Sequence, residues 1–194
     1  MAKSKAKGKT RSAGRTRRSA KSAKASGSGR QQDAIALLKA DHREVEGWFE
    51  EFEKTSSDKR KLDLATKICN ALKVHTTIEE EIFYPAFLEA TEDKEIHHEA
   101  EVEHNGAKRL IGEIEASGPE DDYYDAKVKV LSEMIKHHVK EEEQPGGMFA
   151  EAKKSSMDLE GLAEQLRDRK MQLMNGVIPG ERRSRRLTQP IPMH

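Results

Sequence analysis

Four histidines, each on the apolar stripe of a predicted helix, constrain this chain more than any other feature. They recur about thirty residues apart and are His42, His75, His104 and His138. Apolar residues flank each of them at steps of three and four, as Leu38 and Val45 flank His42. This step is typical of a helix face that packs into a protein core. The chain is therefore predicted to be all-α, with one histidine pointing inward from each of four helices.

Capping residues and helix breakers indicate where the helices begin and end. Four long helices are expected over residues 33–55, 58–90, 93–116 and 121–144, and two shorter ones over 148–153 and 158–174. Asp33 and Asp58 are suitable N-caps. Pro85 should kink the second helix around Glu81, because proline cannot donate a backbone hydrogen bond. The short connections predict an up-down-up-down four-helix bundle followed by a C-terminal amphipathic helix.

The composition changes along the chain and divides it into four parts. Residues 1–30 carry 11 Lys and Arg and no acid, and this low-complexity segment is predicted to be a disordered basic tail. Residues 31–153 are expected to form the bundle, 154–175 the C-terminal helix and 176–194 a flexible tail. Residues 31–180 contain 20 basic and 34 acidic residues, a net charge of −14, so the chain is an acidic globule with basic ends.

Several classes of protein are excluded by what the sequence lacks. Cys69 is the single cysteine, which rules out an internal disulfide and a thiolate metal site. No apolar run approaches the roughly 18 residues that span a membrane, and the N-terminus has no apolar segment typical of a secretory signal. We therefore expect a cytoplasmic protein. Residues 1–30 have the charge density to bind nucleic acid or an anionic membrane surface, and the alternative is a solubilising extension.

Two glutamates turn the four histidines into a candidate metal site. Glu79 follows His75 by four residues and Glu142 follows His138 by four, so each pair shares one helix face. A buried histidine is often an ordinary hydrogen-bonded core residue. A buried carboxylate, by contrast, costs several kcal/mol unless a cation compensates it. Mixed imidazole and carboxylate donors suit iron, manganese or zinc.

The expected turns place the four histidines in one layer of the bundle. On successive helices their depths differ by three to six residues, or roughly 4–9 Å at about 1.5 Å per residue. That spread suits two metals about 3.5–4 Å apart. We expect Glu79 and Glu142 to bridge the two metals. The histidines then divide into two pairs, His42 with His75 and His104 with His138.

On these residues the chain resembles the hemerythrin HHE cation-binding family. The family pattern is a histidine, a His-x-x-x-Glu, a histidine and a second His-x-x-x-Glu on four successive helices, and here it spans roughly residues 33–152. Asp41 before His42, and the run at residues 79–85, strengthen the resemblance. The resemblance implies a left-handed up-down four-helix bundle. It also implies two non-heme iron ions that meet dioxygen or related oxidants, with manganese or zinc less favoured.

The chain departs from the oxygen-carrying hemerythrins on two helices. Those proteins place a second histidine one turn from the third-helix histidine, where this chain has Ala100 and Lys108. They also end on His-x-x-x-x-Asp, whereas this chain has His138-x-x-x-Glu142. One iron would therefore have fewer nitrogen ligands, which counts against reversible oxygen carriage.

Further residues are candidates for the same region. Glu101 precedes His104 by three residues, the step found in ferritin-like di-iron bundles, and is either an additional ligand or a solvated glutamate. His97 either lines the pocket and donates hydrogen bonds to ligands or has a surface role. A solvated face is expected for Glu80, Glu81, Glu141 and Glu143. The apolar pocket wall is expected from Trp48, Phe49, Ile82, Phe83, Ile111 and Ile135.

Three functions fit these expectations. The first is a di-iron protein that binds or senses dioxygen, peroxide or nitric oxide. The second is a di-iron enzyme that detoxifies peroxide or nitric oxide, and the third is iron handling or DNA protection that uses the basic tail. A bundle with metal-free core histidines is the structural alternative. The sequence identifies no catalytic residue, redox partner or oligomeric state.

Overall fold

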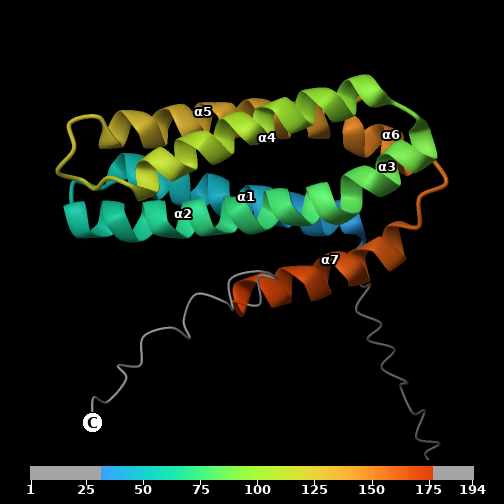
Figure 1. Ribbon diagram of the computed structural model, residues 1–194, viewed down its shortest axis with the longest axis horizontal. Helices are drawn as coiled ribbons and strands as arrows, with labels where there is room; N and C mark the ends of the chain where they lie inside the picture. Colours follow the sequence, from blue (N-terminus) through green and yellow to red (C-terminus); the bar gives the residue numbers. More distant parts are fainter. Residues whose placement is uncertain (1–31, 177–194) are drawn as a thin grey trace, which may run out of the picture. The chain divides into compact units, whose positions relative to one another are not determined.

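The computed structural model describes residues 32–176, and every regular element in that range is a helix (Figure 1). The four long helices are α1 (Ala34–Lys54), α2 (Asp58–Ile78), α4 (Lys94–Glu115) and α5 (Tyr124–Glu143). The remaining elements are η1 (Glu79–Phe83), α3 (Tyr84–Thr91), α6 (Met148–Lys154) and α7 (Leu159–Met174). The predicted all-α class is confirmed. The predictions made for residues 1–30 and for the tail after residue 176 lie outside the described range.

The long helices form two antiparallel hairpins, α1 with α2 and α4 with α5, which lie side by side in Figure 1. Short polar side chains begin three of these helices. Asp33 accepts a hydrogen bond from the backbone N–H of Ala36 at 2.7 Å, as predicted, and Asp93 caps α4 in the same way. At α2 the prediction was off by one residue, because Ser57 and not Asp58 accepts the backbone N–H, that of Arg60 at 3.4 Å. These caps satisfy backbone donors that the first turn leaves unpaired.

Pro85 produces the expected break in the second long helix, in the form of a π-helical turn. Pro85 has no N–H to donate to the carbonyl of Glu81, so the regular ladder cannot continue through it. The backbone N–H of Tyr84 instead donates to the carbonyl of Glu79, five residues back. Glu79 thus begins a widened turn of a kind that is frequent at functional sites.

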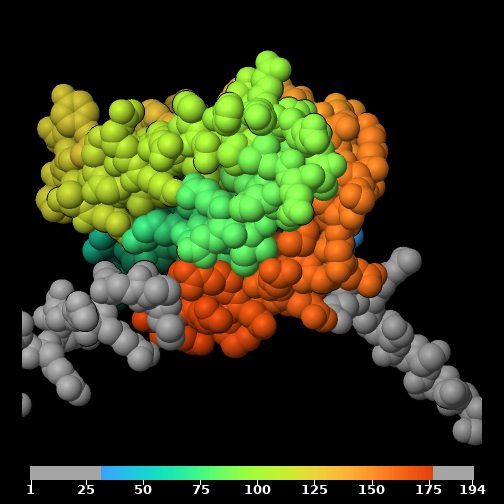
Figure 2. Space-filling model, turned by 45° about the vertical axis from the view of Figure 1, so that its right-hand side comes forward, coloured from blue at the N-terminus to red at the C-terminus, as the bar shows by residue number. Residues whose placement is uncertain are grey.

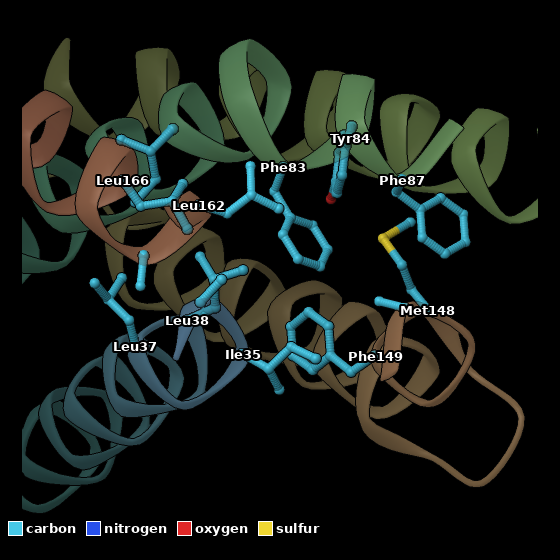
Figure 3. Close-up of a cluster of buried hydrophobic side chains, with 14 of the residues drawn as sticks. Ile35, Leu37, Leu38, Phe83, Tyr84, Phe87, Met148, Phe149, Leu162 and Leu166 are labelled. Atoms are coloured by element: carbon cyan, nitrogen blue, oxygen red, sulfur yellow. The ribbon is translucent and has the colours of Figure 1, made fainter. Parts of the chain in front are cut away.

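The core consists of two apolar clusters separated by the histidine layer. One cluster lies toward the α1–α2 connection and contains Phe49, Phe52, Leu64, Ile68 and Leu131. The other includes Ile35, Leu38, Phe83, Phe87, Phe149 and Leu166 (Figure 3). His42 follows Leu38 of the second cluster and precedes Val45 of the first, so apolar side chains enclose the polar layer from both sides.

Helix α6 lies at one end of the bundle beside α3, and α7 runs along the flank formed by α1 and α2. In Figure 2 the segment from α6 into α7 runs down one end of the described part, and α7 lies against the hairpin of α1 and α2. The buried face of α7 consists of Leu162, Ala163 and Leu166. None of the helices in residues 32–176 combines the length and the apolar character needed to cross a bilayer.

Candidate metal centre

The structure brings the six residues singled out by their spacing into one buried layer. All six side chains belong to residues that are at most 5% exposed, and these central residues are His42, His75, Glu79, His104, His138 and Glu142. They come from α1, α2, η1, α4 and α5, so each of the four long helices supplies at least one of them.

The four histidines meet in two pairs, each within one helix hairpin. Nε2 of His42 lies 3.0 Å from Nε2 of His75, and Nε2 of His104 lies 3.2 Å from Nε2 of His138. Two imidazole nitrogens bound to one metal at about 2.0–2.1 Å, at right angles to each other, would be about 3 Å apart. The spacing within each pair therefore suits two neighbouring ligands of one metal ion.

Each glutamate lies between the two histidine pairs. The two oxygens of Glu79 lie 3.2 Å from Nε2 of His75 and 3.5 Å from Nε2 of His104. The two oxygens of Glu142 lie 3.5 Å from Nε2 of His42 and 3.7 Å from Nε2 of His138. Each carboxylate thus presents one oxygen to each pair.

The carboxylates are buried without sufficient hydrogen-bond donors. Both oxygens of Glu79 and Oε2 of Glu142 are inaccessible to solvent and accept no hydrogen bond within the described residues. Burying a carboxylate in this way is unfavourable unless a cation compensates its charge. Two groups of three, His42/His75/Glu79 and Glu79/His104/His138, offer ligand atoms within 4.8 Å of one another. The donors present therefore fit metal cations.

Two of the central histidines have a raised pKa. Burial alone lowers the pKa of His75, but Glu79 and Asp41 outweigh burial and raise it to about 10. Burial also lowers the pKa of His138, but Glu142 and Glu103 outweigh burial and raise this pKa to about 9. Both imidazoles are therefore protonated at neutral pH, and a metal must displace these protons to bind them.

Burial and neighbouring charges also shift the pKa values of the other central residues. Burial and the charge of His75 lower the pKa of His42 to about 4, and burial also lowers the pKa of His104. Burial and the neighbouring charge of Glu79 raise the pKa of Glu142. Burial would also raise the pKa of Glu79, but the positive charge of His75 lowers it below the ordinary value.

Carboxylates of neighbouring helices accept hydrogen bonds from the outer nitrogens of the histidines. Each Nδ1 faces a carboxylate of a neighbouring helix, and the four pairs are His75 with Asp41 at 3.5 Å, His104 with Glu80 at 2.9 Å, His138 with Glu103 at 2.8 Å and His42 with Glu143 at 2.9 Å. We call these four acids the outer carboxylate ring. They leave Nε2 of every histidine directed toward the centre, which is the arrangement typical of metal-binding histidines.

The outer carboxylate ring corrects one prediction. Glu80 and Glu143 were expected on a solvated face, but each accepts a hydrogen bond from a buried histidine. Glu81 and Glu141 do lie at the surface, where Glu81 pairs with Arg169 of α7. Each member of the ring directly precedes or follows a central residue in the sequence. Because consecutive helix residues point about 100° apart, the neighbour of an inward residue faces the adjacent helix.

Two aromatic residues complete the surroundings of the centre and were not predicted as site residues. The hydroxyl of buried Tyr84 donates to Oε1 of Glu142 at 3.3 Å and lies 3.2 Å from Nε2 of His104. Phe149 of α6 stacks on His42 with ring centroids 5.9 Å apart, and its position beside Ile35 is visible in Figure 3. The π-helical turn places Tyr84, because it rotates the residues after Glu79 relative to a regular helix.

The remaining candidates lie farther from the centre. His97 packs edge-on against Tyr84 at 5.7 Å, and its buried Nδ1 lies 3.8 Å from the carboxylate of Glu101. Glu101 itself is exposed and is not brought to the central residues. Of the expected pocket wall, Phe49, Phe83 and Ile111 are buried, whereas Trp48, Ile82 and Ile135 are partly buried.

Comparisons with known proteins agree with this geometry. The model of the family described as hemerythrin HHE cation binding domain matches residues 33–145. The crystal structure of a hemerythrin HHE cation-binding-domain-containing protein from Mycobacterium kansasii is similar, with a TM-score of 0.62 and 21% sequence identity. The match covers 75% of this chain and 89% of that one, and at this identity it shows a shared fold. Comparison with curated proteins gives no match.

Proposed function

The chain belongs to the hemerythrin HHE cation-binding family, and we propose that its centre holds two non-heme iron ions that react with dioxygen or a related small oxidant. One observation carries the proposal. Two buried glutamates lie between two pairs of histidines, and both oxygens of Glu79 and Oε2 of Glu142 lack a hydrogen-bond donor. Metal ions on each side of these carboxylates would compensate their charge and use every inward-facing donor.

The residues divide into two sets of ligands. His42 and His75 would hold one iron, His104 and His138 would hold the other, and Glu79 and Glu142 would offer carboxylate oxygens to both. Imidazole nitrogen mixed with carboxylate oxygen suits iron, manganese or zinc, and membership of the family favours iron. Bound iron would supply one-electron redox chemistry toward a small oxidant.

The protein's own groups hold the ligands, exclude water and carry protons. The outer carboxylate ring fixes the orientation of the four imidazoles. The apolar clusters on both sides of the layer, with Phe149 stacked on His42, keep bulk water away from the centre. Tyr84 holds a proton on its hydroxyl between His104 and Glu142, where burial keeps its pKa well above the ordinary value.

Binding or sensing of the oxidant is the function that this geometry supports best. The six central residues are at most 5% exposed, so only small molecules would reach them. A cytoplasmic setting is part of the proposal, since the buried thiol of Cys69 is free. The test is the optical spectrum of the iron-loaded protein, which should change in a stoichiometric way on addition of dioxygen, peroxide or nitric oxide.

The second candidate is a di-iron enzyme that consumes peroxide or nitric oxide. Tyr84 favours it, because its buried hydroxyl donates a hydrogen bond to Glu142 at 3.3 Å and would be the nearest phenolic proton to an oxidant bound at the centre. Steady-state consumption of peroxide by the purified iron-loaded protein separates the two. Many turnovers per centre would establish the enzyme, and a single equivalent consumed would establish the binding protein.

A further inference from the structure

The six central residues are buried, so a small molecule needs a path through the surrounding helices to reach them. A cleft of about 270 Å³ runs between α1 and α5, and His42 lines it. A larger groove of about 980 Å³ runs along α2 beside α1, α4 and α7, and none of the six central residues lines it. Of these two hollows, the α1–α5 cleft is therefore the one that a central residue lines.

The walls of the α1–α5 cleft are apolar and its rim is charged. Phe49, Ile135 and Val139 form the walls. On the rim, Glu143 accepts hydrogen bonds from Nδ1 of His42 at 2.9 Å and from Arg43 at 2.5 Å. The cleft thus extends from solvent to a histidine whose Nε2 faces Glu142 inside the centre.

The basic residues of the rim outnumber the acidic ones. Arg43 is compensated by Glu46 and Glu143. Lys136 and Lys140, one turn apart on α5, line the same cleft and have no acidic partner in the described part of the chain. The segment 31–180 carries a net charge of −14, so a small anion is repelled by the globule as a whole. Two uncompensated lysines at this rim create the local field that would attract it.

The size of the cleft limits what it admits. A water molecule takes about 30 Å³ of liquid volume, so a cleft of about 270 Å³ holds about nine waters or a small solute and is too small for a nucleotide or a larger cofactor. We propose that the α1–α5 cleft is the access route to the centre, and that Lys136 and Lys140 steer small monovalent anions into it. This inference rests on the proposed function, because it assigns a ligand class and a route to the same site.

The test compares an anionic and a neutral ligand of similar size on the iron-loaded protein. Azide is mixed with the oxidised protein and nitric oxide with the reduced protein, and both association rates are followed by stopped-flow absorbance. The variant Lys136→Ala/Lys140→Ala removes the steering charges. The control Lys59→Ala/Lys94→Ala makes the same change in net charge at exposed positions outside the cleft.

At low ionic strength the rim variant should bind azide about five- to tenfold more slowly than the control, since steering of this kind is worth about 10-fold or more in association rate. Its nitric oxide rate should match the control. In the wild type, the azide rate should fall as salt is added, whereas the rim variant should lose most of this dependence. Equal azide rates in the two variants, or an equal slowing of nitric oxide, would overturn the steering role.

A second pair of variants tests the route itself. Val139→Phe narrows the cleft wall, and Val130→Phe places the same bulk at an exposed position on the same helix. We expect Val139→Phe to slow both azide and nitric oxide, and Val130→Phe to slow neither. Unchanged rates in Val139→Phe would show that ligands enter elsewhere. If the wild type shows no spectral change with either ligand, the proposed function fails and this inference fails with it.

Discussion

His138 on α5 donates a hydrogen bond from Nδ1 to Glu103 on α4, with the two atoms 2.8 Å apart. The same relationship recurs around the bundle, where Glu143 accepts from His42 and Glu80 from His104. A hydrogen bond at Nδ1 fixes the tautomer and leaves the Nε2 lone pair directed toward the centre. The outer carboxylate ring therefore prepares the histidines for metal binding before any metal arrives.

Loss of one member of the ring should weaken metal binding without unfolding the protein. We expect Glu103→Ala to lower metal affinity by about 10- to 100-fold, because His138 loses the partner that orients its ring. The measurement is competition for iron with a chromophoric chelator. Glu101→Ala is the matched control, since Glu101 is an exposed neighbour on the same helix. Equal iron affinities in Glu103→Ala and Glu101→Ala would contradict a positioning role for Glu103.

Removal of a central residue should abolish the iron pair. Glu79→Ala takes away a carboxylate shared by both halves of the centre, and His138→Ala takes away one of four inward-facing nitrogens. Metal analysis should give fewer than two irons per chain in both variants. The controls Glu113→Ala and His98→Ala change exposed residues of α4 and should keep the full metal content. An unchanged content in both central variants would refute the ligand set.

The inward-facing residues could be read from the sequence because helix periodicity alone decides which face they share. A step of three and four residues puts His42 on the same stripe as Leu38 and Val45, and the structure encloses that stripe between two apolar clusters. The break at Pro85 could also be predicted locally, because proline has no backbone N–H to donate. Its form as a π-helical turn was not predicted.

The outer carboxylate ring could not be read in this way, because it depends on which helices are neighbours. Glu80 and Glu81 look alike in the sequence, yet Glu80 faces α4 and Glu81 faces α7. The pairing of Tyr84 with Glu142 joins residues 58 positions apart and follows from the π-helical turn. Such contacts are set by packing between elements, for which a single sequence carries no periodic signal.

Metal binding should strengthen as the pH rises from 7 toward 9. The pKa of His75 is raised to about 10 and that of His138 to about 9, so both are protonated in the metal-free protein at pH 7. A metal must displace these protons, and a higher pH makes their removal less costly. Calorimetric titration with zinc in buffers of different ionisation enthalpy should show release of at least two protons per chain at pH 7. Release of none would mean that the histidines are not the ligands.

Tyr84→Phe should preserve the fold and the metal content while changing the reactivity of the centre. The variant removes only the hydroxyl that donates to Glu142 at 3.3 Å and lies 3.2 Å from His104. We expect two irons per chain, an altered spectrum of the oxidised protein and a slower reaction with peroxide, on the order of 10²-fold if the phenol supplies the proton. Tyr123→Phe, at an exposed position, is the control. Identical spectra and rates in both variants would exclude Tyr84 from the chemistry.

The most direct test of the di-iron centre is metal analysis combined with an anaerobic-to-aerobic optical spectrum of protein produced with iron. We expect about two irons per chain and a new near-ultraviolet and visible band when air is admitted. Zero or one metal per chain, with no spectral response to air, would contradict it.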